Sequence, residues 1–236
     1  MLPATLPNIQ GLELAAASLT CTEAGGDFFD VIPEAHGSPS RTALLVGDVS
    51  GHGLDAALLM ATARAFLRMR ALQAGSPAEA VTDVNRLLTR DTYGTGRFMT
   101  LFYLEYDHAT RSMTWVRAGH DPAILYRARE DIFEELAGPG IPLGALEDRT
   151  FAQLEAPVPR PGDVLLLGSD GLWEARGPSG EMFGKERVRQ ALRAAAAQPA
   201  QEVLQALLKT LEDFRGHGAP EDDVTLLVMK TLPEEA

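Results

Sequence analysis

Short apolar runs bounded by turn-forming residues recur along this chain and predict β-strands. Each run is rich in branched or aromatic residues, the composition typical of strands. The turn at residues 107–112 separates two of the runs so closely that we expect an antiparallel hairpin there. The predicted strands are residues 12–18, 42–48, 98–106, 113–117, 123–127, 163–168 and 224–230.

Apolar residues at helical spacing predict helices between these strands. An Ala/Leu-rich run at residues 54–66 follows the second predicted strand. At residues 76–88, Ser76 stands at a plausible N-cap, Pro77 at the first helical position and Glu79 at the third. This segment and residues 199–214 each place their apolar side chains on one stripe, formed by Val81, Val84 and Leu88 in the first and by Val203, Leu207, Leu211 and Phe214 in the second.

The order of these elements favours an α+β fold. The strands come in pairs and groups and do not alternate strictly with helices, so mainly antiparallel sheets are expected in place of a doubly wound parallel one. Neither a repeat nor a low-complexity linker divides the chain. We therefore expect residues 1–236 to form a single domain.

Composition narrows the classes of partner. The 33 acidic residues outnumber the 21 basic ones and give a net charge of -12, which opposes nucleic acid or an anionic membrane as the main partner. The single cysteine, Cys21, excludes an intrachain disulfide framework and a site built from several thiolates. Apolar runs fall short of the roughly 18 residues that a membrane span needs. We expect a cytoplasmic protein.

Aspartates stand in an unusual position, next to glycine and at the boundary of an apolar run. They are Asp27 in "AGGDFFDV", Asp48 in "GDVSGHG", Asp170 in "VLLLGSDGLWE", and the pair Asp222 and Asp223 in "EDDVTLLV". Taken singly, each fits a helix cap, a turn or a solvated strand start. Together they predict carboxylates gathered at one rim of a sheet, where they would repel one another unless a cation lay among them.

Oxygen ligands without paired histidines or cysteines favour hard divalent ions, so the implied cofactor is Mg²⁺ or Mn²⁺. Two ions about 3.5–4 Å apart can turn a bridging water into a nucleophile and neutralise charge on a phosphoryl group. The residues therefore indicate hydrolysis of a phosphate ester.

Six motifs occur in order along the chain: "GGDFFD" (25–30), "GDVSGHG" (47–53), "AGH" (118–120), "GIPLG" (140–144), "GSDGLWE" (168–174) and "DDVT" (222–225). This set resembles the metal-dependent protein serine/threonine phosphatases (the PPM or protein phosphatase 2C-like family). In particular it is similar to their bacterial SpoIIE-like or RsbU-like branch, over about residues 10–231. The resemblance implies a four-layer αββα sandwich, in which helices flank two antiparallel sheets and a dinuclear metal centre lies at one edge.

The resemblance also implies roles for single residues. Asp48 should bridge both ions, with Asp27 and the backbone carbonyl of Val49 on one of them. Asp170 and Asp222 should hold the other ion, and Asp223 is the alternative to Asp222. Asp48, Asp27 and Asp170 are accordingly the predicted catalytic residues.

The remaining motif residues receive weaker interpretations. His52 could supply a proton near the metals, but a role in orienting its loop is favoured, and His120 is expected to pack or form hydrogen bonds. Gly51 and Gly53 should permit a backbone shape that side chains forbid. The arginine that many eukaryotic relatives place near the first acidic motif has no counterpart beside "TEAGGDFFD".

The leading hypothesis is a phosphatase that acts on phosphoserine or phosphothreonine of a bacterial regulatory protein, which the resemblance suggests is an anti-anti-sigma factor. Two alternatives are a regulatory binding module with incidental turnover and a phosphatase of small phosphate esters. The resemblance further implies an upstream sensor domain or activator. The segments after Gly53 and at residues 87–98 are candidates for a regulatory helix and loop, and a homodimer through the helical layer is conceivable.

Overall fold

The computed structural model describes residues 2–216 and 220–233, so the outermost residues of the predicted domain and residues 217–219 lie outside it. Within the described part, ten strands form two antiparallel five-stranded sheets. Sheet A has the order β1 (Leu12–Leu19), β10 (Val224–Thr231), β9 (Val164–Gly168), β6 (Ala123–Arg127) and β7 (Ile132–Leu136). Sheet B has the order β2 (Phe28–Pro33), β3 (Arg41–Val49), β4 (Met99–Asp107), β5 (Ser112–Ala118) and β8 (Gln153–Pro157).

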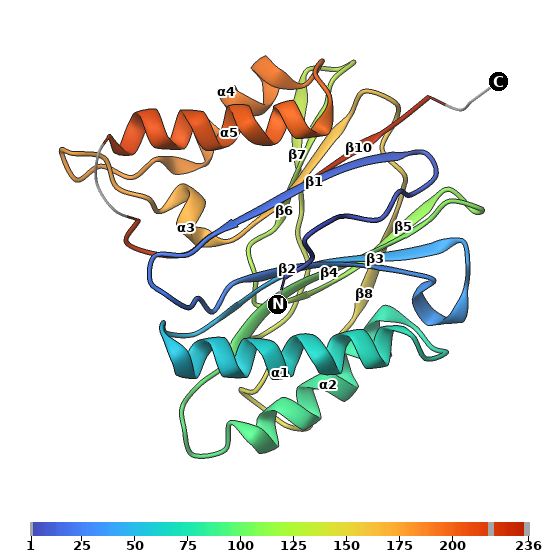
Figure 1. Ribbon diagram of the computed structural model, residues 1–236. Coiled ribbons are helices and arrows are strands. Elements are labelled where there is room, and N and C mark those ends of the chain that lie inside the picture. The colour runs from blue at the N-terminus through green and yellow to red at the C-terminus, as the bar shows by residue number, and fades with distance from the viewer. Residues whose placement is uncertain (1, 217–219, 234–236) are drawn as a thin grey trace.

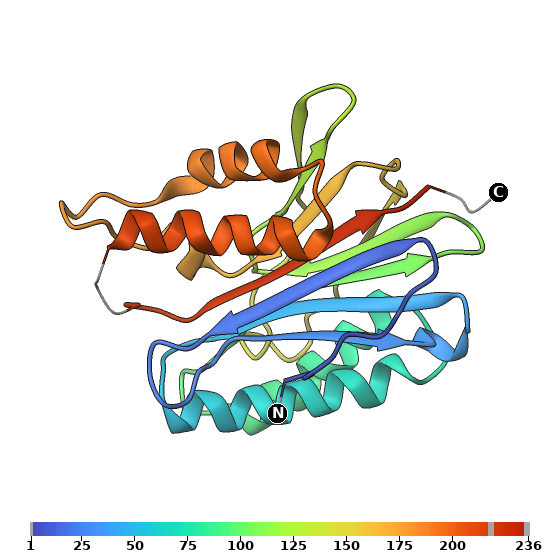
Figure 2. The same cartoon turned by 45° about the horizontal axis from the view of Figure 1, so that its top comes forward.

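Helices cover the outer faces of both sheets, as Figures 1 and 2 show from two directions. On sheet B lie α1 (Leu54–Ala71) and α2 (Pro77–Asp91), and a short 3-10 turn, η1 (Ala35–Gly37), precedes β3. On sheet A lie α3 (Asp170–Trp173), α4 (Gly184–Ala195) and α5 (Ala200–Arg215). The predicted four-layer αββα sandwich is therefore confirmed.

Three apolar clusters hold these layers together. One joins sheet B to α1 and α2, a second joins sheet A to α3, α4 and α5, and the third fills the space between the sheets. Because side chains alternate along a strand, each central strand supplies two clusters at once. On β3, for example, Leu45 faces the helices and Leu44 faces the other sheet.

The predicted strands and helices are all present, and the hairpin between β4 and β5 is confirmed. Helix α2 begins as the sequence predicts: Ser76 and Glu79 form a reciprocal capping box around Pro77. The apolar pattern did not predict β2, β7, β8 or α4. Strands β7 and β8 lie at sheet edges, where charged residues such as Glu134 and Glu155 interrupt the apolar alternation.

A buried ion-pair cluster ties α1 to sheet B. Asp30 on β2 is fully buried, and its carboxylate lies 2.7 Å from Nη1 of Arg68 and 2.9 Å from Nε of Arg64, both on α1. Its Oδ1 also accepts a hydrogen bond from the backbone N–H of Val31. Charged groups this deep are stable only when paired, so the cluster fixes where α1 lies against β2.

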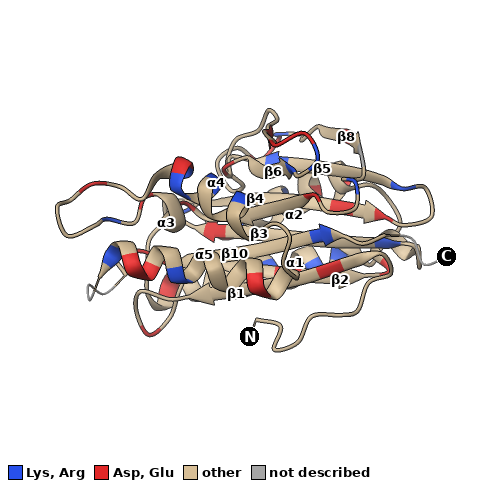
Figure 3. Cartoon of the chain, turned by 90° about the horizontal axis from the view of Figure 1, so that it is seen from above, with Lys and Arg blue, Asp and Glu red and all other residues tan. Residues whose placement is uncertain are grey.

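Charged residues are mixed over the outer helices. Figure 3 shows acidic and basic positions interspersed along α5. In residues 2–216 and 220–233, no helix is both long and apolar enough to cross a membrane.

Candidate metal centre

Four segments that carry the predicted aspartates meet at one edge of the sandwich, toward the left of Figure 1. Asp27 directly precedes β2, Asp48 is the penultimate residue of β3, Asp170 opens α3, and Asp222 lies two residues before β10. The strand ends and helix starts of both sheets therefore bring together residues that are up to 195 positions apart in the sequence.

Asp27 is the most deeply placed of these carboxylates, with 4% of its surface exposed. Burial raises the pKa of its carboxyl group well above the usual range, and the neighbouring Asp48 raises it further. A hydrogen bond from Oγ of Ser169, 2.6 Å from Oδ2 of Asp27, opposes this rise and fixes the orientation of the carboxyl group. Ser169 is thus a positioning residue for Asp27.

Asp48 is partly buried in the centre of the group. Burial raises the pKa of its carboxyl group to about 7, and the negative charges of Asp170 and Asp222 contribute to the rise. A hydrogen bond with Asp27 opposes it. Asp48 therefore lies close to carboxylates from three other segments, those of Asp27, Asp170 and Asp222. A bridging ligand is expected in such a position.

Asp170 and Asp222 form the more open half of the group. Burial, and then the charge of Asp222, raises the pKa of Asp170. Asp222 itself is exposed to solvent at the start of the segment that leads into β10. This half of the edge is thus accessible from outside, whereas the half around Asp27 is enclosed.

Asp223 has a different environment from its neighbour Asp222. Its Oδ1 accepts a hydrogen bond of 2.8 Å from the backbone N–H of Cys21, and its Oδ2 accepts one of 2.8 Å from that of Gly26 and a longer one from that of Asp27. Both carboxylate oxygens therefore hold the turn between β1 and β2, which places Asp27 at the edge.

Glycines in the first acidic motif allow this close approach. A Cβ on Gly25 would lie 2.2 Å from Oδ2 of Asp223, and one on Gly26 would lie 2.8 Å from the carbonyl oxygen of Val49. Distances this short are excluded for real side chains. The two glycines therefore keep the Asp223 carboxylate in place and leave the Val49 carbonyl uncovered.

The donor set fits hard divalent cations, because it consists of carboxylates and a carbonyl. In the described part of the chain, no three Asp, Glu, His or Cys side chains already stand together in the geometry of an ion site. Burial and mutual repulsion raise the pKa values of Asp27, Asp48 and Asp170, and a bound cation would relieve both effects.

His120 braces the two sheets next to these carboxylates. Its Nδ1 lies 2.8 Å from Oγ1 of Thr100 on β4, and its Nε2 lies 3.1 Å from the carbonyl oxygen of Gly168 on β9. Burial lowers the pKa of the imidazole to about 4, so the ring is neutral at physiological pH. The expected hydrogen-bonding role of His120 is confirmed.

A small pocket of about 130 Å³ opens beside His120. Its lining includes Asp48 and Asp170 together with Thr100 and Asp121. Asp121 accepts hydrogen bonds from Nε1 of Trp173 and from Nζ of Lys185. Asp121, held in place by Trp173 and Lys185, therefore forms one side of the pocket, and Asp48 and Asp170 form another.

The loop between β3 and α1 is held by hydrogen bonds to Arg97 and Phe98, just before β4. Ser50 exchanges hydrogen bonds with the backbone of Phe98, and Nη1 of Arg97 donates to the carbonyl oxygen of Ser50. Gly51 and Gly53 have φ angles of 89° and 82°, which confirms that these positions need glycine. His52, in contrast, is exposed, and its predicted role in orienting the loop stays a prediction.

Sequence patterns missed four residues that shape this edge. Ser169, Thr100, Asp121 and Arg97 carry no signal of their own, because serine, threonine and isolated charges are common at turns and strand ends. Their positions offered the available clue: Ser169 lies within the "GSDGLWE" motif, and Asp121 directly follows the "AGH" motif.

Several proteins are similar to this chain over most of its length. The chain is 25% identical over 233 residues to the phosphoserine phosphatase RsbU of Bacillus subtilis (strain 168), across 98% of this chain and 66% of that protein. The chain thus spans only part of that relative's length. It also superimposes, with a TM-score of 0.79 and 29% identity, on the RsbU and RsbW domains of Rv1364c from Mycobacterium tuberculosis, over 98% of this chain and 62% of that one.

The same fold occurs in the crystal structure of RsbX in complex with magnesium, with a TM-score of 0.69 and 15% identity over 96% of this chain and 98% of that chain. Residues 38–232 match the family model described as stage II sporulation protein E. That match covers most of both sheets and all the predicted site residues except Asp27. The chain therefore belongs to the SpoIIE family.

Proposed function

We propose that this chain is a Mg²⁺- or Mn²⁺-dependent phosphatase that hydrolyses phosphoserine or phosphothreonine in a regulatory protein. The observation that carries the proposal is the meeting of Asp27, Asp48, Asp170 and Asp222 at one edge, where burial and the neighbouring carboxylates raise the pKa values of the first three. A bound divalent cation would relieve this repulsion, and the oxygen donors at the edge are of the kind that such a cation prefers. Membership of the SpoIIE family and the similarity to RsbU support the same activity.

We assign the ligands to two ions. Asp48 would bridge them, because carboxylates from both halves of the edge influence its pKa. Asp27 and the uncovered carbonyl of Val49 would hold the enclosed ion, and Asp170 with Asp222 would hold the open one. Asp223 would act as a positioning residue, since both of its oxygens already accept backbone hydrogen bonds.

Bound ions would supply an activated water and would neutralise charge on the phosphoryl group. The residues of the chain would fix the geometry of that reaction. Ser169 holds the carboxyl group of Asp27, and the neutral His120 keeps β4 and β9 at a constant separation beside the pocket. The open side at Asp222 gives a phosphorylated side chain access to the edge.

The regulatory partners follow from the relatives. RsbU is named a phosphoserine phosphatase, and the Mycobacterium tuberculosis protein joins an RsbU domain to an RsbW domain. We propose a phosphorylated regulatory protein as the substrate, of the anti-anti-sigma type that the resemblance in sequence suggests, with a sensor domain or activator upstream and a cytoplasmic location. We further propose that the chain forms one phosphatase domain.

The test is manganese-dependent phosphate release from a phosphoserine protein or peptide. We expect release by the wild-type chain and its loss in Asp48→Ala, while Asp213→Ala, which removes an exposed carboxylate on α5, leaves the rate unchanged. An unaltered rate in Asp48→Ala contradicts the proposal. Binding of a partner without turnover would instead favour the regulatory binding module, and turnover restricted to small phosphomonoesters would favour the third hypothesis.

A further inference from the structure

A second, larger pocket of about 390 Å³ lies next to the open half of the metal centre. It shares Asp222 and Gly171 with that edge, and its outer wall comes from the segment between α3 and α4. The remaining lining is both apolar and charged, and includes Arg176, Met182, Glu221 and Val224. The proposed metal ligands do not account for this space.

The outer wall is a small hairpin in which Arg176 and Met182 are directly paired as an isolated antiparallel bridge. Paired residues of a bridge project to the same side, and both of these line the pocket. We call Arg176 and Met182 the hairpin platform. It presents one cationic and one apolar group beside Asp222.

Hydrogen bonds close the hairpin on itself. The backbone N–H of Gly177 donates to the carbonyl of Glu181, and that of Phe183 donates to the carbonyl of Ala175. Nη1 of Arg176 reaches the carbonyl oxygen of Gly180 at 3.0 Å. The backbone that carries the platform is therefore fixed before any ligand binds.

The base of the hairpin is anchored on α5. Phe183 is fully buried, and its ring centroid lies 5.2 Å from that of Phe214. Arg187 stacks over Phe214 and also donates to the carbonyl oxygens of Met182 and Phe183. Because the support is rigid, the platform can discriminate between ligands at a small cost in ordering.

The platform itself remains open to a partner. Met182 is 47% exposed. The side chain of Arg176 is 48% exposed, and besides its hydrogen bond to Gly180 it makes a loose ion pair of 3.8 Å with Glu221. An exposed methionine is a flexible apolar contact that adapts to aliphatic side chains. A loosely paired guanidinium can donate to a peptide carbonyl in the same approach.

We propose that the hairpin platform binds the peptide segment that flanks the phosphorylated residue, and that it selects an aliphatic side chain within two residues of that residue. The aliphatic side chain would lie on Met182, and Arg176 would donate to a backbone carbonyl of the same segment. This inference rests on the proposed function, because it places the phosphorylated residue at the neighbouring edge. It adds a determinant of substrate specificity that lies outside the metal centre.

The test compares synthetic phosphoserine peptides in the presence of Mn²⁺. One set carries leucine at one of the four positions within two residues of phosphoserine, and the matched set carries serine there. For the wild-type chain we expect kcat/KM to be roughly tenfold higher for the best leucine peptide, the size of discrimination that one apolar contact provides. In Met182→Ser this preference should disappear through a higher KM.

Three controls separate the platform from other effects. Met69→Ser changes a similarly exposed methionine on α1, 52% exposed, and should keep the leucine preference. Hydrolysis of p-nitrophenyl phosphate, which has no flanking residues, should be equal in wild type and Met182→Ser. Arg176→Ala should raise KM for leucine and serine peptides alike without changing p-nitrophenyl phosphate turnover.

Three results would overturn the inference while leaving the proposed function intact, and the first two concern the leucine preference. One is peptide hydrolysis by the wild type with no leucine preference, and the other is an unchanged preference in Met182→Ser. Equal losses on peptides and on p-nitrophenyl phosphate in Met182→Ser would also reject it, since the residue would then act on the metal centre. Hydrolysis of p-nitrophenyl phosphate without hydrolysis of any peptide would overturn both the inference and the proposed function.

Discussion

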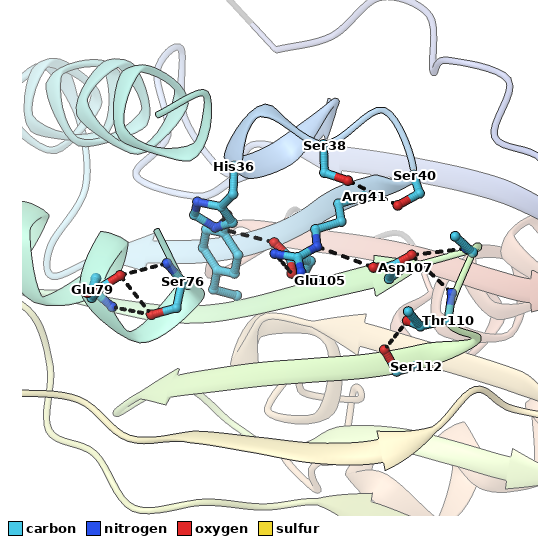
Figure 4. Close-up of polar contacts among 12 residues, drawn as sticks. His36, Ser38, Ser40, Arg41, Ser76, Glu79, Glu105, Asp107, Thr110 and Ser112 are labelled. Atoms are coloured by element: carbon cyan, nitrogen blue, oxygen red, sulfur yellow. Dashed lines mark hydrogen bonds and ion pairs between the residues drawn. The ribbon is translucent and has the colours of Figure 1, made fainter. Parts of the chain in front are cut away.

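Carboxylates lie in opposite electrostatic settings at the two ends of strand β3. At its start, Arg41 lies 3.2 Å from Asp107 and 3.6 Å from Glu105, and His36 faces Glu105 at 3.3 Å (Figure 4). At its end, Asp48 faces other carboxylates. At the start of β3, acidic and basic side chains neutralise each other. At its end, the charged neighbours that act on Asp48 are all acidic.

The pKa values report the difference. Although burial raises it, hydrogen bonds from Ser40, from backbone N–H groups at Thr110 and Ala109, and from Arg41 hold the pKa of Asp107 below its usual value. The pKa of Asp48 rises to about 7. Hydrogen-bond donors of the fold compensate the charge of Asp107, whereas the charges that act on Asp48 come from other carboxylates. The comparison thus distinguishes structural acids from candidate metal ligands.

The largest expected effect comes from changing aspartate to asparagine at two sites: Asp30, which has arginine partners, and Asp48, which lies among carboxylates. Asp30→Asn should lower the free energy of unfolding by about 3–5 kcal/mol, because it leaves Arg64 and Arg68 without their buried counter-charge. Asp48→Asn should instead raise the stability of the metal-free protein, because it removes a repelling charge. Urea unfolding with EDTA measures both, and destabilisation of equal size at the two sites would refute the distinction.

Glu105 lies between the two cases, because Arg41 offsets only part of the effect of burial on its pKa. Burial raises the pKa of its carboxyl group from 4.5 to about 7, although Arg41 opposes the rise. The folded state therefore binds a proton that the unfolded state releases, so this group's contribution to stability is complete below about pH 4.5 and falls as pH rises through 7.

The expected loss from Glu105 over that interval is about 3 kcal/mol. Glu105→Gln should flatten the pH dependence by this amount. The measurement is the free energy of unfolding from pH 5 to pH 8 in both proteins, and the difference between the two curves isolates this group. Parallel curves would show that the network at the start of β3 already compensates Glu105 fully.

A smaller effect is expected from the residue that orients a candidate ligand. Ser169→Ala removes the hydrogen bond to Asp27 and leaves every proposed metal ligand in place. Loss of such a supporting contact typically weakens metal binding by about 10- to 100-fold. Titration of thermal stability with Mn²⁺ should show this shift. An unchanged titration midpoint would mean that Asp27 needs no support from Ser169.

The sequence predicted the parts of this arrangement that depend on local pattern. Capped or amphipathic helices such as α2 and α5, and the strands that end in Asp48 or precede Asp170, follow from spacing and turn chemistry. The role of Asp223 could not be predicted, because its carboxylate binds backbone groups 202 and 197 positions away at Cys21 and Gly26. Edge strands such as β7 were missed since their outward face is charged.

The most direct test of the central claim is a crystal structure with Mn²⁺, in which anomalous scattering locates the ions. We expect two peaks at the edge, both in contact with Asp48, while Asp223 keeps its hydrogen bonds to the backbone. Asp27 and the Val49 carbonyl should touch one peak, and Asp170 and Asp222 the other. An edge without manganese, or manganese held by Asp223 and not by Asp48, would contradict the account.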